Sequence, residues 1–88
     1  MDVTFDPSKD QTNRAKHGLS LAEAAGLDWA TARVSEDDRF DYGEARFKAL
    51  GLLGNRVHMV VFTLRDGIVR VISLRKANRR EVQEYEKD

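Results

Sequence analysis

The chain has 88 residues and no net charge at pH 7, with 15 basic against 15 acidic side chains. At 41% hydrophobic and 34% charged residues, its composition is that of one small globular domain, which argues against a disordered chain. It has no cysteine, which excludes disulfides, thiolate metal sites and thiol nucleophiles. We see no run of roughly 20 apolar residues, as a membrane helix needs, and no secretory pattern. We therefore expect a cytoplasmic protein without membrane contact, and no metal or cofactor.

The N-terminal part of the sequence predicts a short strand followed by two helices. Val3–Phe5 has the composition of a strand. Asp6 followed by Pro7 is typical of a helix start, and this helix should run to about Lys16 or His17 before Gly18. Ser20-Leu21-Ala22-Glu23 is a capping box for a second helix. The apolar face of that helix would consist of Leu21, Ala24, Ala25 and Trp29.

The rest of the chain predicts mainly strands. Thr31–Ser35 is compatible with a strand, and an acidic, aromatic, turn-like segment follows at residues 36–44. Three strand runs come next, at Ala45–Leu53, Arg56–Arg65 and Ile68–Lys76, with turn residues Gly54-Asn55 and Asp66-Gly67 between them. Asn78 to Glu81 is a capping pattern for a last helix that carries Val82 and Tyr85. The prediction is a single α+β domain over residues 1–88, with an antiparallel sheet of about four strands, two N-terminal helices and one C-terminal helix.

Charge is distributed unevenly along the sequence. Residues 46–80 contain nine lysines and arginines and one acidic residue, Asp66, whereas residues 1–44 contain five basic and ten acidic residues. A sheet that carries arginines can bind a phosphate backbone through charge-assisted, often bidentate hydrogen bonds. The alternative is a solvated sheet whose arginines pair with the acidic half of the chain. Composition alone leaves both interpretations open.

The two hairpin turns predict a register. The second turn places Arg65 opposite Ile68, Thr63 opposite Arg70, Val61 opposite Ile72, and His58 opposite Arg75. The first turn places Glu44 opposite Arg65, Arg46 opposite Thr63, and Phe47 opposite Phe62. Because side chains alternate between the two faces of a sheet, one face should form a core wall. Its predicted members are Phe47, Ala49, Val60, Phe62, Leu64, Val69 and Val71.

The opposite face should gather basic side chains around Thr63. These are Arg46, Lys48, Arg65 and Arg70, with Glu44 at the margin. In this register His58, Ser73 and Arg75 lie on the core-facing side. We interpret His58 as a half-buried histidine with a satisfied hydrogen bond, Ser73 as structural, and Tyr85 as a core residue.

Four blocks of the sequence together resemble the BrnT toxins of bacterial type II toxin–antitoxin systems. The blocks are Asn13-x-x-Lys16-His17-Gly18-x-Ser20, Asp38-Arg39-x-x-Tyr42-Gly43-Glu44-x-Arg46, Val60-x-x-Thr63-x-Arg65, and Arg70-Val71-Ile72-Ser73-x-Arg75-Lys76-Ala77 with Glu81 and Tyr85. The resemblance implies a RelE-like fold and a ribonuclease that arrests translation. It also implies a BrnA-like antitoxin with a ribbon-helix-helix domain, operator DNA bound only through that antitoxin, and a heterotetramer of two toxins and two antitoxins.

Metal-independent RNA cleavage would use attack of the 2′-hydroxyl on the adjacent phosphate, which needs a base, cationic donors and an acid. We predict that His17, Glu44, Arg65 and Arg75 are catalytic, with Arg75 identified by the family motif. The predicted RNA-binding residues are Lys16, Arg39, Tyr42, Arg46, Lys48, Arg70 and Lys76.

Three of these roles have structural alternatives. His17 is either a proton carrier or, with Lys16, a cap for the last helix carbonyls. Glu44 is either a base or a partner that holds Arg65. Tyr42 and Phe40 either stack on unpaired bases or pack the loop onto the domain. For the whole chain, the alternative function is a non-catalytic module that binds nucleic acid or a protein partner.

Overall fold

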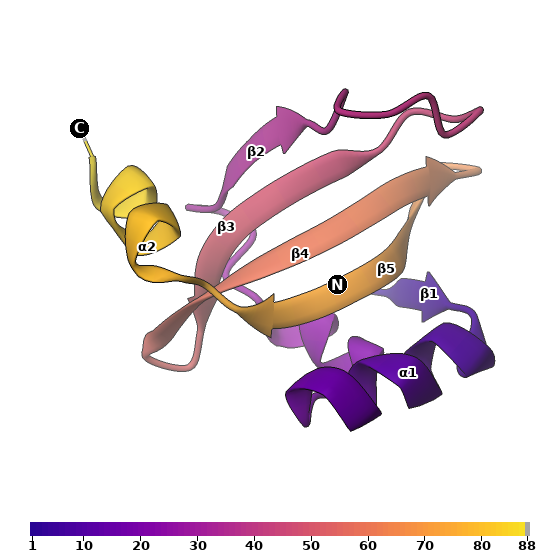
Figure 1. Cartoon of the computed structure of the whole chain (residues 1–88), viewed down its shortest axis with the longest axis horizontal. Coiled ribbons are helices and arrows are strands. Elements are labelled where there is room, and N and C mark those ends of the chain that lie inside the picture. The colour runs from indigo at the N-terminus through magenta and orange to yellow at the C-terminus, as the bar shows by residue number, and fades with distance from the viewer. Residues whose placement is uncertain (88) are drawn as a thin grey trace.

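The computed structural model describes residues 1–87. Its elements follow one another as β1 (Val3–Phe5), α1 (Pro7–His17), the 3₁₀ helix η1 (Leu21–Gly26), β2 (Arg33–Glu36), β3 (Phe47–Leu53), β4 (Arg56–Arg65), β5 (Ile68–Lys76) and α2 (Arg79–Glu86). The strands form one five-stranded sheet in the order β1-β5-β4-β3-β2. Figure 1 shows α1 near β1 and β5, and α2 at the opposite end of the molecule, beside β3. No helix in residues 1–87 is long and apolar enough to cross a membrane.

The α+β class is confirmed, but the sheet and the second helix differ from the prediction in detail. The sheet is mixed rather than antiparallel, because β1 pairs parallel to β5 at one edge. No local sequence pattern predicts this pairing, because the two strands lie more than 60 residues apart in the chain. The second helix is a 3₁₀ helix of 6 residues. Its predicted capping box is present, with the Ser20 N–H donating to Glu23 Oε2 at 2.9 Å.

The ends of α1 agree with the sequence signals. Asp6 accepts a hydrogen bond from the Ser8 N–H at 2.8 Å, and Pro7 is the first helical residue. At the other end Gly18 adopts a φ of 70°, and its N–H donates to the Arg14 carbonyl. Only glycine reaches this left-handed conformation without strain, so the helix ends where the sequence predicts.

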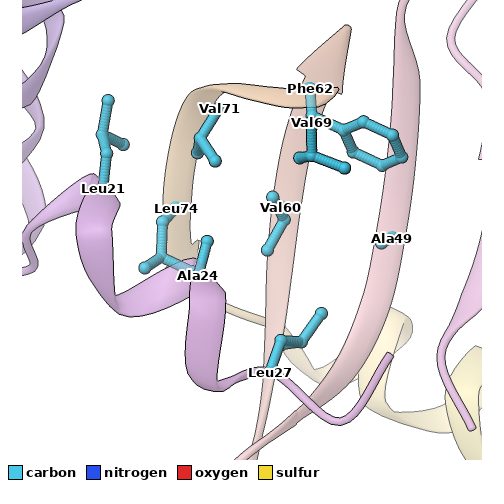
Figure 2. Packing of buried hydrophobic residues seen from close by; sticks show 9 residues of the cluster. All are labelled: Leu21, Ala24, Leu27, Ala49, Val60, Phe62, Val69, Val71 and Leu74. Carbon is cyan, nitrogen blue, oxygen red and sulfur yellow. The ribbon is translucent and has the colours of Figure 1, made fainter. Parts of the chain in front are cut away.

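The main core lies between the sheet and the segment that contains η1. Figure 2 shows Leu21, Ala24 and Leu27 facing the sheet residues of the cluster. Those sheet residues are Ala49, Val60, Phe62, Val69, Val71 and Leu74. The predicted core wall is therefore largely confirmed. Leu64 is the exception, since it is 51% exposed near the β4–β5 turn.

A second apolar cluster lies under α2 on the other face of the sheet. Its buried residues are Leu50, Val57, Met59 and Ala77, and Val82 and Tyr85 of α2 pack against them. The prediction that Tyr85 packs into a core is thus confirmed. The cluster is confined to one part of this face, and Arg65, at the far end of β4, is exposed. The remainder of the face holds polar side chains and the exposed Ile68, which lies opposite Arg65.

Candidate active site

Several of the predicted basic residues lie on the sheet face that carries α2. Thr63 is paired with Arg70, Arg65 with Ile68, and Phe47 with Phe62, as the hairpin turns predict. Lys48 lies opposite Val61, which belongs to the cluster under α2. Lys48, Arg65 and Arg70 therefore share one face, because side chains directly opposite each other lie on the same side of a sheet. We call this surface the basic face.

A β-bulge adds Arg75 to the basic face and corrects the predicted register of β5. The pairing shifts between Val61 and Phe62: Phe62 lies opposite Val71, but Val61 lies opposite Ser73, so Ile72 is the extra residue. The predicted pairs of Val61 with Ile72 and of His58 with Arg75 are therefore wrong. An extra residue in a strand inverts the facing of every residue beyond it. Arg75 consequently lies opposite Met59, on the α2 side.

The other residues beyond the bulge change sides in the same way. Ser73 lies opposite Val61 and is not core-facing, whereas Leu74 fills the main core and is fully buried. His58 stays on the core-facing side, is buried, and has its Nδ1 2.8 Å from the Arg56 carbonyl oxygen. The hydrogen bond agrees with the interpretation of His58, but the side chain is buried rather than half-buried. Lys76 lies opposite His58 and therefore points away from the basic face.

Arg75 is held by an acidic residue at the start of α2. Its Nη1 and Nη2 donate to Glu81 Oε1 and Oε2 at 2.7 and 2.8 Å. Hydrogen bonding to Glu81 raises the pKa of Arg75, and hydrogen bonding to Arg75 lowers the pKa of Glu81. Glu81 also accepts from the Asn78 N–H, while its own N–H donates to Asn78 Oδ1. The predicted capping box thus also fixes a guanidinium on the basic face.

A groove of about 700 Å³ lies between α2 and the strands β2 and β3. Its apolar floor includes Leu50 and Met59. Its charged lining residues are Arg33, Lys48, Arg80, Glu81 and Glu84. Of these, only Lys48 was among the residues that the sequence predicts for the site. The sequence signal for this lining is helical spacing, because Glu84 follows Arg80 by four residues and Glu81 by three, which is about one turn in each case.

The segment between β2 and β3 is organised around Asp37, which is 3% exposed. Arg39 donates to both of its carboxylate oxygens, at 2.8 and 2.9 Å, and the Tyr42 hydroxyl donates to Oδ2 at 3.3 Å. These bonds, led by that from Arg39, lower the pKa of Asp37 to about 2 and raise the pKa of Arg39. Arg39 and Tyr42 are therefore held in fixed positions by a buried carboxylate that the sequence did not single out.

Tyr42 in turn contacts Arg46, and a glutamate joins this segment to the basic face. The Arg46 guanidinium lies 4.0 Å from the centre of the Tyr42 ring, a cation–π contact. Glu44 lies 3.8 Å from Arg46 and 3.6 Å from Arg65, measured between carboxylate oxygens and guanidinium nitrogens. One face of Tyr42 is thus occupied by Arg46, and Glu44 is paired with two cations.

His17 and Lys16 occupy a different part of the molecule. They lie in the last turn of α1 and line a groove of about 330 Å³ between α1 and β5. This groove shares no lining residue with the groove beside α2. The register therefore places Lys48, Arg65, Arg70 and Arg75 on the same face of the sheet, with Arg65 and the partner of Arg75, Met59, six residues apart along β4. Arg39, Tyr42, Glu44 and Arg46 lie in the adjoining segment. His17 and Lys16, in the groove beside α1, and Lys76, on the opposite side of the sheet, do not lie among these residues.

Within residues 1–87, no three histidine, aspartate or glutamate side chains gather in a way that could hold a metal ion. Comparison with curated proteins finds no match. Comparison with protein-family models finds the family described as "Ribonuclease toxin, BrnT, of type II toxin-antitoxin system", which matches residues 5–81. The matched range includes α1, the whole sheet from Phe5 onward and the Glu81 that holds Arg75. The chain belongs to the BrnT family of ribonuclease toxins of type II toxin–antitoxin systems.

Proposed function

We propose that this chain is a metal-independent endoribonuclease whose basic face binds and cleaves RNA, and that this cleavage arrests translation. The observation that carries the proposal is the position of Arg75. The β-bulge at Ile72 turns it to the side of the sheet that holds Lys48, Arg65 and Arg70. Four cations on one face, beside a groove with an apolar floor, suit a phosphate and its attached base.

In the proposed reaction, the 2′-hydroxyl loses its proton to water and attacks the adjacent phosphate, and the bond from phosphorus to the 5′-oxygen of the next nucleotide breaks. One product ends in a 2′,3′-cyclic phosphate, and the 5′-oxygen of the other takes up a proton from water. Negative charge develops on the phosphate oxygens, and Arg75 and Lys48 donate hydrogen bonds to them. One such donor typically contributes about 2–4 kcal/mol to stabilisation of a transition state. Arginine stays protonated throughout, so it stabilises charge and does not act as the base.

Most of the remaining predicted residues receive one of three roles in this proposal. Arg39, Tyr42, Arg46, Arg65 and Arg70 bind the RNA chain on either side of the cleaved bond. Glu44, which lies 3.8 Å from Arg46 and 3.6 Å from Arg65, holds these two cations. His17 and Lys16 lie in the separate groove beside α1, so we assign them to contacts with a more distant part of the RNA rather than to cleavage.

We further propose that a BrnA-like antitoxin with a ribbon-helix-helix domain inhibits the chain. Membership of a type II family supports a protein antitoxin. An antitoxin that dimerises through its DNA-binding domain would bind two copies of this chain and connect them to operator DNA. Light scattering on the co-purified complex tests this proposal, and we expect the mass of two toxins and two antitoxins.

Incubation of the purified chain with end-labelled RNA, in excess EDTA and without ribosomes, tests the activity. We expect fragments that end in 2′,3′-cyclic phosphate. Intact RNA from folded protein would contradict a free-standing nuclease. The same assay with translating ribosomes then separates ribosome-dependent cleavage from the alternative of a non-catalytic binding module.

A further inference from the structure

The contacts of Arg75 define which edge of its guanidinium is open to a ligand. An arginine side chain carries five N–H donors in one plane. Glu81 accepts from Nη1 and Nη2, which is an end-on pairing with the tip of the side chain. Nη1 also donates to the Lys76 carbonyl oxygen at 3.3 Å. Three of the five donors are therefore used within the protein.

The two remaining donors lie side by side. They are Nε–H and the second hydrogen of Nη2, and no acceptor for either is found within residues 1–87. These hydrogens point in parallel from one edge of the guanidinium plane. Two parallel donors match two oxygens of a phosphate, the geometry for which arginine is favoured over lysine.

We propose that Glu81 is the positioning residue of the site: it fixes Arg75 so that the Nε–Nη2 edge forms a fork for the phosphate of the RNA. This inference rests on the proposed function and adds to it the atoms that bind the phosphate and the residue that orients them. Glu81 does not touch RNA in this account. It acts through Arg75, whose side chain is 35% exposed and so remains accessible, while the Glu81 side chain is only 18% exposed.

The same carboxylate makes the orientation rigid. Glu81 Oε1 accepts from the backbone N–H of Asn78 at 2.9 Å, a bond that does not involve the Asn78 side chain and that fixes the carboxylate at the start of α2. The edge that Glu81 occupies is thereby closed to solvent anions, and only the Nε–Nη2 edge is left. Preorganised donors avoid reorganisation during the reaction, which is the main advantage of fixed dipoles in an active site.

Glu81→Gln tests the proposal, because glutamine has one acceptor oxygen and presents an N–H donor to the guanidinium.

Two controls separate this role from helix capping. Asn78→Ala removes the capping side chain of α2 but leaves the Glu81 carboxylate on Arg75. Glu23→Gln changes the equivalent capping-box glutamate of η1, which contacts no arginine. We expect kcat/KM for a labelled RNA to fall at least about tenfold for Glu81→Gln, mostly in kcat, and to stay within about threefold for both controls.

Equal losses of kcat/KM in Glu81→Gln and Asn78→Ala would overturn the proposal, because helix capping alone would then explain the effect.

A second measurement does not depend on cleavage or on the folding of a variant. The Nε–H signal of Arg75 in NMR spectra of the wild-type protein should shift when a 2′-O-methyl RNA oligonucleotide, which cannot be cleaved, is added. Binding without such a shift would overturn the phosphate fork. A shift in a protein that cleaves no RNA would instead contradict the proposed nuclease function and leave the fork intact.

Discussion

The side-chain amide of Asn13 pairs with the backbone of Leu74 as a neighbouring strand would. Its Nδ2 donates to the Leu74 carbonyl at 2.8 Å, and its Oδ1 accepts from the Leu74 N–H at 3.1 Å. Leu74 follows the bulge at Ile72 and precedes Arg75. The amide therefore connects α1 to β5 at the point where the register places Arg75 on the basic face.

Asn13→Ala is expected to lower the free energy of unfolding by about 1–3 kcal/mol, since it leaves a buried N–H and a buried C=O without partners. Urea unfolding followed by circular dichroism measures this change. Thr12→Ala is the control, because Thr12 is exposed and its hydroxyl bonds only within α1. An equal effect of the two substitutions would contradict a special role for Asn13.

The buried carboxylate of Asp37 predicts a pH dependence. Its pKa in the folded chain is about 2, below the ordinary value of 3.8. A lowered pKa stabilises the fold fully above pH 3.8, and this stabilisation is lost as the pH falls toward 2. The stability difference between the wild type and Asp37→Asn should therefore shrink below about pH 4. Urea midpoints measured between about pH 7 and pH 2.5 check this, and a constant difference would contradict it.

The exposed Arg65 and the half-buried Arg70 of the basic face predict a dependence of RNA binding on salt. For single strands, the slope of log K against log salt is about −0.7 for each phosphate that the protein neutralises. Arg65→Ala and Arg70→Ala should each make the slope less negative by roughly this amount, because each removes one cation. Fluorescence anisotropy with uncleavable 2′-O-methyl RNA at several salt concentrations gives the slopes. Slopes that equal the wild-type slope would remove these two residues from the interface.

Local signals in the sequence predicted much of the fold. The Asp66-Gly67 turn adopts positive φ at both residues, 54° and 77°, and its hairpin begins in the predicted register with Thr63 opposite Arg70. The Asn78–Glu81 capping pattern and the Asp6-Pro7 helix start are likewise present. In each case a few adjacent residues determine the conformation.

Features that depend on distant contacts were not predictable in this way. The bulge at Ile72 places Leu74 in the main core, where Asn13, about 60 positions away in the sequence, binds its backbone. The extra residue of the bulge, Ile72, decides the side of the sheet on which Arg75 lies. The partnership of Glu81 with Arg75, and that of Asp37 with Arg39 and Tyr42, also depend on tertiary positions. The basic face was therefore predicted only in part.

If RNA is cleaved on the basic face, cleavage should depend on Arg75 and not on an arginine of the opposite face, and a comparison of Arg75→Ala with Arg56→Ala tests this. Both substitutions remove one arginine from the sheet, but Arg56 is exposed and alternates with Val57 to the other side. After circular dichroism has established that both variants are folded, each is incubated with end-labelled RNA in EDTA. We expect at least about a tenfold loss of cleavage for Arg75→Ala and little change for Arg56→Ala. Cleavage by folded Arg75→Ala at the wild-type rate would contradict it.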